Sequence, residues 1–368
     1  MRFDLKSSFL SSSVLFQTLL SFNIILAILN VLLLLIMPFH KMSVERRARR
    51  HREMFDAYGK AFRGLGSSEF TLVPPSVPLE YEAFADSAAN VMMEVDVNPL
   101  LRNFVRSQNV VIAYYTKQLS SRSWVKRFNA AERLGGLQLS DLKPVLESAL
   151  MREKDVRVIS RLVWGISFIA DGDSVMFINT ILKDPHFMSS KFSEFIYCNI
   201  LRAFKLRNQE YDLALLLGTL MNSSEFPVML KRDIIQACGN EGFEDAEKLV
   251  LEAFERFHDV PEMKMAIIRT INRLQLDKGQ RVIISSLQDD DWRIRSVAAK
   301  DIHVNSTEIY SLLEKLLRDD NYIVRFNSAV SLVNAGRLGI EILQINIGCD
   351  DRFARDISCY VLRRYVRI

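Results

Sequence analysis

The first pattern along this chain is an uninterrupted apolar stretch near the N-terminus. Residues 14–37 contain no charged side chain, and residues 32–35 are four consecutive leucines. A helix rises about 1.5 Å per residue, so a helix over this range can cross a hydrocarbon core of about 30 Å. A cleaved signal peptide has a shorter apolar region and a small-residue cleavage site, which Pro38 and Phe39 do not provide. The pattern therefore predicts a transmembrane helix.

A different pattern begins at about residue 99, where blocks of apolar residues at helical spacing alternate with polar turns. One block has apolar residues at i, i+3, i+4, i+7 and i+8, namely Ile309, Leu312, Leu313, Leu316 and Leu317. This spacing gives one apolar stripe along a helix. The polar residues 319–321 interrupt the stripe, and Val324, Ala329 and Leu332 then mark a second one. Each block of the pattern therefore predicts a pair of helices.

The second helix of each predicted pair follows a repeated template. It contains an apolar residue, a basic residue, two small residues and an apolar residue eight positions after the first, as in 324–332 and 294–302. Earlier and more degenerate copies bring the total to about eight helix pairs between residue 99 and the end. Self-similarity at a period of about 30 to 45 residues is typical of helical solenoids, whose repeats bury their apolar faces against their neighbours.

Charged residues recur with the same period. In four successive copies an aspartate stands five residues ahead of a basic residue: Asp259 and Lys264, Asp290 and Arg295, Asp320 and Arg325, Asp350 and Arg355. An aspartate at the turn can accept a hydrogen bond from the free backbone N–H groups that open the second helix. The same carboxylate is well placed to pair with the basic residue about one turn further in. We therefore interpret these residues as a structural ladder that keeps successive repeats in register.

The template resembles HEAT repeats, in particular the short bacterial variety whose second helix opens with Asp, two or three residues, Val-Arg and a small-residue pair. Asp320, Val324, Arg325, Ser328 and Ala329 carry the resemblance best. It implies an all-α fold, a right-handed α-α superhelix of about eight helix pairs, here preceded by one transmembrane helix. In that family the Asp and Arg residues form a ladder between adjacent repeats, and the second helices line a concave binding surface.

Basic residues are concentrated just after the apolar stretch: Lys41, Arg46, Arg47, Arg49, Arg50 and Arg52. Because basic residues close to a span stay on the cytoplasmic side, we expect a short extracytoplasmic N-terminus (1–13), a transmembrane helix (14–37) and a basic juxtamembrane segment (38–63) in the inner or plasma membrane. A linker rich in Gly, Ser and Pro (64–80) would then lead to a cytoplasmic solenoid (81–368).

The charge balance differs between the two parts of the chain. Up to Arg63 there are ten Lys and Arg against four Asp and Glu, which leaves 38 against 40 in the rest of the chain. A slightly acidic solenoid is not expected to bind nucleic acid, because phosphate binding requires a basic face. A polybasic stretch beside a span can attract anionic lipid, so a lipid-binding membrane organiser is one alternative function.

The motifs that mark catalytic, cofactor and metal sites are missing from the sequence. It contains no His-Glu-x-x-His, phosphate loop, Gly-x-Gly-x-x-Gly, Gly-x-Ser-x-Gly or Cys-x-x-Cys. We therefore predict no catalytic residue, no cofactor and no metal site, and a protein that is not an enzyme. The resemblance keeps a second alternative open, because the bilin lyases and the alkylpurine DNA glycosylases are enzymes with HEAT-like repeats.

The C-terminal helix has apolar residues on or near one stripe, Ile357, Val361, Tyr365 and Ile368, and no polar capping helix follows it. An uncovered apolar end predicts a docking site for a partner chain or a second copy of this chain. The sequence as a whole predicts a single-pass membrane scaffold whose solenoid binds protein partners. By analogy with similar bacterial proteins, the partner would be a membrane enzyme such as a surface-polysaccharide glycosyltransferase.

Overall fold

The computed structural model describes residues 5–65, 74–94, 99–188, 191–300, 302 and 306–366. All regular elements in these ranges are helices, which confirms the all-α prediction. The chain divides into two compact units, Met1–Tyr114 and Tyr115–Ile368. We call these unit 1 and unit 2.

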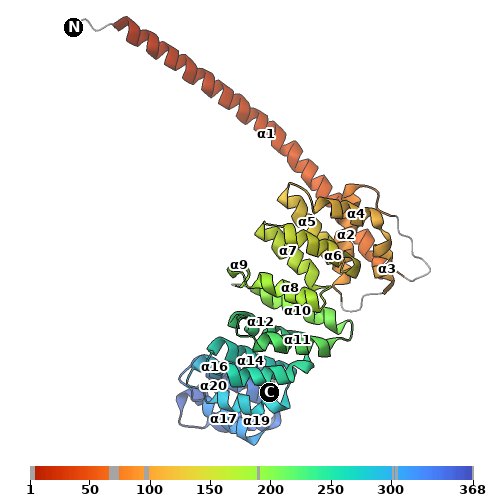
Figure 1. The fold of residues 1–368 in the computed structure, drawn as a ribbon. Coiled ribbons are helices and arrows are strands. Elements are labelled where there is room, and N and C mark those ends of the chain that lie inside the picture. The colour runs from red at the N-terminus through yellow and green to blue at the C-terminus, as the bar shows by residue number, and fades with distance from the viewer. Residues whose placement is uncertain are drawn as a thin grey trace. The chain divides into compact units, whose positions relative to one another are not determined.

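Unit 1 contains α1 (Leu5–Arg63), α2 (Pro78–Met92), α3 (Pro99–Ser107) and the first part of α4 (Asn109–Gln118). Figure 1 shows α1 as one long helix that extends well beyond α2, α3 and α4. Pro38 lies inside this helix, so the apolar segment and the predicted juxtamembrane segment are parts of one element. The apolar side chains of α1 from Leu19 to Phe39 are exposed. By length and composition α1 is able to cross a membrane.

The C-terminal part of α1 packs against α2 along its whole length. Two polar contacts join the two helices, Arg47 to Glu82 at 3.1 Å and His51 to Asp86 at 3.1 Å. A third contact, Arg63 to Glu94 at 2.5 Å, follows in the same order just after the end of α2. The two helices therefore run parallel. Their surfaces meet closely, since a Cβ on Gly59 would lie 3.2 Å from the hydroxyl oxygen of Ser87.

Aromatic side chains fill the centre of unit 1. Phe62 and Phe84 are fully buried and meet edge to face with ring centroids 5.2 Å apart, and Phe104 from α3 lies 6.4 Å from Phe62. The last third of the predicted juxtamembrane segment is thus part of the core of unit 1, and the part before it already contacts α2 through Arg47 and His51. The apolar stretch and the core of unit 1 are joined by unbroken helix.

The predicted linker, 64–80, is only partly visible, because residues 66–73 lie outside the described residues. Its C-terminal boundary is wrong by a few residues, since α2 begins at Pro78. Proline is well suited to the first helical position, where no N–H donor is needed. Glu80 reinforces this start by accepting hydrogen bonds from the backbone N–H groups of Ser76 at 2.6 Å and Val77 at 3.3 Å.

Unit 2 consists of consecutive helix pairs stacked one on the next (Figure 1). The first helices are α6 (Lys143–Arg152), α8 (Gly172–Leu182), α11 (Glu210–Asn222), α13 (Glu247–Phe257), α15 (Gln280–Leu287), α17 (Thr307–Leu316) and α19 (Arg337–Ile347). The second helices are α5 (Trp124–Gly136), α7 (Val156–Ser167), α10 (Lys191–Lys205), α12 (Val228–Glu241), α14 (Pro261–Leu274), α16 (Trp292–Ala298), α18 (Tyr322–Asn334) and α20 (Arg352–Tyr365). Short elements, η1 (Ser140–Leu142), α9 (Pro185–Met188), η2 (Glu244–Ala246) and η3 (Asp277–Gly279), lie between them.

Neighbouring second helices pack against each other, and among the first helices α11 packs against α13 and α17 packs against both α15 and α19. This two-layer arrangement is that of a helical solenoid. One close approach is between α5 and α7, where a Cβ on Gly135 would lie 2.4 Å from the Cα of Gly165. Residues larger than glycine at these two positions would push the helices apart, so both glycines are required by packing.

Side-chain caps define where the second helices start. Asp155, Asp291 and Asn321 each accept a hydrogen bond from the backbone N–H two residues further on, and Asp351 accepts one from the N–H three residues on. These are preferred N-cap residues. The caps of the last three second helices therefore stand one residue after the predicted Asp290, Asp320 and Asp350.

Candidate functional site

A ladder of ion pairs connects successive repeats. Arg295 of α16 makes a two-point contact with Asp319 of the following repeat, with Nε to Oδ2 at 2.7 Å and Nη2 to Oδ1 at 3.1 Å. The same guanidinium donates from Nη1 to the backbone carbonyls of Asp289 at 2.8 Å and Asp290 at 2.9 Å in its own turn. Hydrogen bonding to Asp319 raises the pKa of Arg295. Arg295 thus ties its own turn to the next one.

The same geometry occurs at other repeats. Lys264 pairs with Asp289, and Arg127 makes a two-point contact with Glu153 at 2.6 and 2.9 Å. Burial acts to raise the pKa of Glu153, but hydrogen bonds from Arg127 and from two backbone N–H groups outweigh burial and leave that pKa below its usual value. The Arg127 pair was not predicted, because its partner is a glutamate 26 residues away.

The carboxylates that form the ladder stand one residue before the predicted ones. Asp259, Asp290, Asp320 and Asp350 are all exposed at the turns, and the carboxylates that pair with the preceding repeat are Asp289 and Asp319. Asp290 and Asp320 contribute only their backbone carbonyls, which accept from Arg295 and Arg325. In the turns at 289–291 and 319–321, the first acidic residue points back toward the previous repeat, while the second is exposed to solvent.

The ladder changes chemistry at its C-terminal end. Cys349 occupies the position that Asp289 and Asp319 hold in the earlier repeats, so it offers no carboxylate to Arg325. The guanidinium of Arg325 instead lies 4.3 Å from the ring centroid of Phe353, a favourable cation–π contact. Arg355 keeps only the local part of the pattern and donates from Nη1 to the carbonyl of Cys349 at 3.2 Å.

Charge is segregated between the two layers of unit 2. The second helices contain 20 Lys and Arg and six Asp and Glu, a net charge of +14, while the first helices from α6 to α19 contain seven and ten, a net charge of −3. Acidic residues of the turns offset part of this charge near the N-terminal ends of the second helices, where the helix dipole favours them. The nearly neutral total of the sequence concealed this basic layer.

Charged and polar side chains of α10, α12 and α14 contact one another across the basic layer. A chain of hydrogen bonds crosses these three helices: Asn240 donates to Glu194 at 2.7 Å, and Arg273 donates to the side-chain oxygen of Asn240. Arg269, one turn before Arg273, is exposed and makes no ion pair with a described residue. Partial burial, followed by the like charges of Arg273 and Arg232, lowers the pKa of Arg269. Arg232 pairs with Asp233 at 2.5 Å, so Arg269 and Arg273 are the arginines without an ion pair among the described residues at this place, which we call the arginine patch (Arg232, Arg269 and Arg273).

Exposed apolar side chains accompany the basic layer. They lie mainly in the first turns of the second helices, and the larger ones are Trp124, Phe195, Met229, Trp292, Tyr322 and Phe353, all between 38% and 55% exposed. Trp124 and Trp292 stand at equivalent positions of two repeats. Large apolar and aromatic side chains beside arginine are typical of protein-binding surfaces.

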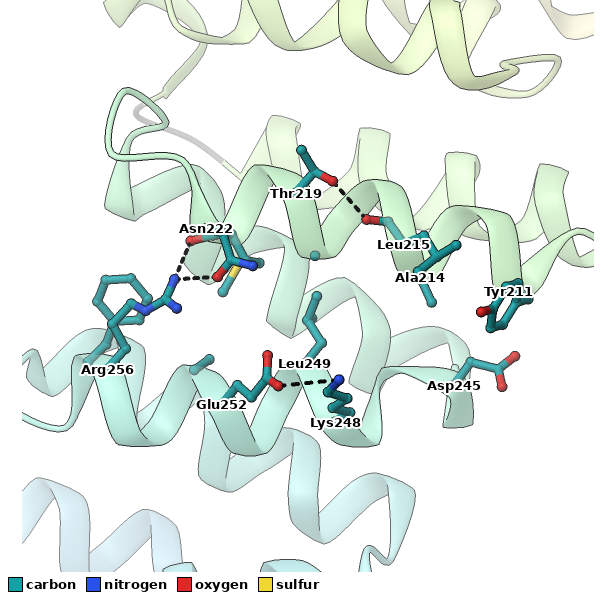
Figure 2. A pocket seen from close by; sticks show the side chains of 14 residues that line it. Tyr211, Ala214, Leu215, Thr219, Asn222, Asp245, Lys248, Leu249, Glu252 and Arg256 are labelled. Atoms are coloured by element: carbon teal, nitrogen blue, oxygen red, sulfur yellow. Dashed lines mark hydrogen bonds and ion pairs between the residues drawn. The ribbon is translucent and has the colours of Figure 1, made fainter.

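The first-helix layer contains a groove between α11 and α13 with a volume of about 500 Å³. Figure 2 shows Arg256 closing one end by donating to the carbonyl of Met221 at 3.2 Å and to Asn222 Oδ1 at 2.6 Å, and the Lys248–Glu252 ion pair along one wall. The groove is open at Gly218, where an added Cβ would meet no atom within 4 Å. Its lining mixes acidic, basic and apolar groups and selects no one ligand chemistry.

Two of the four residues that were predicted to form a docking site at the C-terminus are buried. Ile357 and Val361 are buried, because their stripe on α20 faces α18 and α19. Tyr365 is 47% exposed, and Ile368 lies outside the described residues. Leu338 and Ile345 on α19 are exposed aliphatic side chains near this end.

The predicted membrane-surface residues are not equivalent. Arg47 pairs with Glu82 on the side of α1 that faces α2, and Lys41 lies 3.9 Å from Glu45. Arg46, Arg49, Arg50 and Arg52 are exposed and make no ion pair with a described residue. No group of three or more His, Cys, Asp or Glu side chains in the described ranges could hold a metal ion.

Comparison with known proteins adds little beyond the fold. No family model matches the sequence, and no curated protein matches it. Among solved structures, the chain is similar to the complex of CpcE and CpcF of phycocyanin lyase from Nostoc sp., with 14% sequence identity. The match covers 81% of this chain and 98% of that chain with a TM-score of 0.25. A likeness this distant carries no argument about function.

The prediction that this chain is not an enzyme is corrected, because it rested on missing sequence motifs alone. The matched structure belongs to an enzyme, a lyase, and the absence of short catalytic motifs in a sequence does not exclude catalysis by side chains that the fold brings together. The exclusion is therefore withdrawn, while the class of fold, a helical solenoid, stands on the stacked helix pairs themselves.

Proposed function

We propose that the protein is a scaffold held at a membrane by α1 and that the second-helix layer of unit 2 binds an acidic partner protein. The observation that carries the proposal is the segregation of charge, +14 on the second helices against −3 on the first. The proposal includes the predicted single membrane span and the right-handed superhelix, in which second helices line the concave side. It also keeps the predicted cytoplasmic position of the solenoid.

The basic layer favours a protein partner over a small ligand. Its charges are spread over many consecutive helices, and exposed aromatic residues such as Trp124 and Trp292 lie along the same layer. Interfaces between proteins bury about 800 Å² on each partner and use aromatic residues and arginine as anchors. Complementary charge mainly raises the rate of encounter and excludes wrong partners, so we expect the acidic partner to bind less well at high salt.

The test uses the full chain in intact membranes. A photoreactive residue at Phe195 on α10 should cross-link a partner chain, while the same residue at Leu215 on the exposed side of α11 should not. The double variant Arg269→Glu/Arg273→Glu should lower the yield at Phe195 by at least tenfold. The matched control Arg281→Glu/Lys315→Glu makes the same change of net charge on first helices.

Three results would contradict the proposal. Equal loss of cross-linking in both double variants would mean that the total charge, and not the layer, governs binding. Cross-links of equal yield from Phe195 and Leu215 would remove the distinction between the layers. Loss of the captured species after nuclease treatment would identify nucleic acid as the partner.

A further inference from the structure

The part of α1 between the apolar stretch and the packing on α2 has two different sides. Residues that contact α2 or its ion pairs, such as Arg47, His51 and Phe62, recur along one side. At 3.6 residues per turn, residues 39, 42, 46, 49 and 50, which are three, seven, ten and eleven positions after the first, form a second side. This second side borders α2 at the first turn of α2, where Phe39, Met42, Arg46 and Arg50 line a hollow with Leu79. We call this side the outer face of α1: Phe39, Met42, Arg46, Arg49 and Arg50.

The outer face combines apolar and basic residues in a definite order. Phe39 is 74% exposed and Met42 is 47% exposed, and both directly follow the apolar stretch. The three arginines come next, and none of them makes an ion pair with a described residue. An apolar end followed by basic residues on one helix face is the composition that places a helix in the headgroup region of an anionic membrane.

Distances along α1 agree with this placement. If the hydrocarbon core ends at Met37, the headgroup layer extends about 5 to 8 Å further, and Phe39 and Met42 lie within it, about 3 and 7.5 Å along the helix. Arg46 lies about 13.5 Å along the helix. Side chains of a helix lean toward its N-terminus, which here is the membrane side. The guanidinium of Arg46 therefore reaches the headgroups, and those of Arg49 and Arg50 lie within about one Debye length of them.

We propose that the outer face of α1 binds anionic lipid headgroups and that this contact sets the direction in which α1 leans as it leaves the bilayer. The inference rests on the proposed membrane anchoring. Arg46 contributes most, Arg49 and Arg50 contribute less, and Arg52 contributes nothing because it is further along the helix and on another side.

The experiment measures which lipids gather around the full chain in vesicles. Spin-labelled phosphatidylglycerol and phosphatidylcholine are compared by the fraction of each that the protein immobilises. We expect the native chain to favour phosphatidylglycerol several-fold, since each arginine at the headgroup layer changes the population by roughly fivefold. The preference should disappear in 1 M salt, where the Debye length falls to about 3 Å.

Two variants with equal loss of charge separate the outer face from the rest of α1. Arg46→Gln/Arg49→Gln should lose most of the preference, and Arg52→Gln/Lys60→Gln should keep it. Equal preferences in both variants would overturn the inference. If the native chain is integrated in the vesicles yet shows no preference, only the lipid contact fails. If an alkaline wash strips the native chain from the vesicles, both the anchoring and the lipid contact are refuted.

Discussion

Replacing Asp319 tests the corrected ladder most directly. The Asp319 side chain is 5% exposed and its Arg295 partner 18% exposed. Breaking a fully buried pair by removing one member costs about 3 to 5 kcal/mol. Arg295 is partly exposed and keeps two backbone carbonyl acceptors, which lowers this cost, while the N–H of Asn321 loses its acceptor at about 1 kcal/mol. We expect Asp319→Ala to lower the free energy of unfolding of this region by about 2 to 4 kcal/mol.

The neighbouring Asp320 serves as the matched control. Its side chain is exposed, and Asn321 holds the capping position of α18. Asp320→Ala should therefore change stability by less than about 0.5 kcal/mol. A cap at Asp320, which the sequence favoured, would instead give a loss of about 0.5 to 2 kcal/mol.

The assay must report on α16 and α18 alone, because a solenoid can open one segment at a time. Hydrogen exchange of backbone amides in the full chain, followed by mass spectrometry, gives this local reading. A loss of 2 to 4 kcal/mol corresponds to exchange about 30 to 900 times faster in these helices. Similar acceleration by Asp320→Ala, or no coupling between Asp319→Ala and Arg295→Met in a double-mutant cycle, would refute the reasoning.

Three further predictions concern unit 2. Because the pKa of Glu153 is lowered in the folded chain, its ion pair stabilises the fold at pH values above the ordinary glutamate pKa of about 4.3. This stabilisation is lost as the pH falls through the lower pKa of the folded chain. Arg127→Met should therefore flatten this part of the pH profile of thermal unfolding. Gly165→Ala should lower the free energy of unfolding by about 1 to 3 kcal/mol through overpacking. Gly218→Ala adds a methyl group in open space on a helix and should raise the free energy of unfolding by about 0.5 to 1 kcal/mol. Chemical denaturation measures both changes. Cys349→Asp should restore the missing carboxylate opposite Arg325 and slow hydrogen exchange in α18 and α20, and faster exchange would show that the Phe353 contact excludes an ion pair.

The helices of unit 2 were predictable because their signals are local. Apolar spacing at 309–317 and at 324–332 places one stripe on each helix, and the structure has α17 and α18 there. The ladder register was not predictable from spacing. Three acidic residues follow one another at 289–291, and only the turn geometry decides which pairs, which faces solvent and which caps.

The functional surfaces were harder to predict for two physical reasons. Net charge over a whole chain averages opposite layers, and the basic layer becomes visible only when charge is counted helix by helix. An apolar stripe on a terminal helix does not imply an exposed end, because the preceding helices already cover it, as α18 and α19 cover Ile357 and Val361. The segment 38–63 was assigned from its charge alone, and its aromatic residues, Phe55, Tyr58 and Phe62, were the signal that it belongs to a packed core.

The continuity of α1 gives unit 1 a fixed rotational phase relative to the apolar stretch. In a helix each residue turns the chain by about 100°, so inserting one residue between Phe39 and Arg46 would rotate unit 1 by that angle, and inserting seven would nearly restore it. A flexible connection would tolerate any insertion equally. Partner binding that varies with a period of about 3.6 inserted residues would therefore show that α1 sets the orientation of unit 1 in addition to anchoring it.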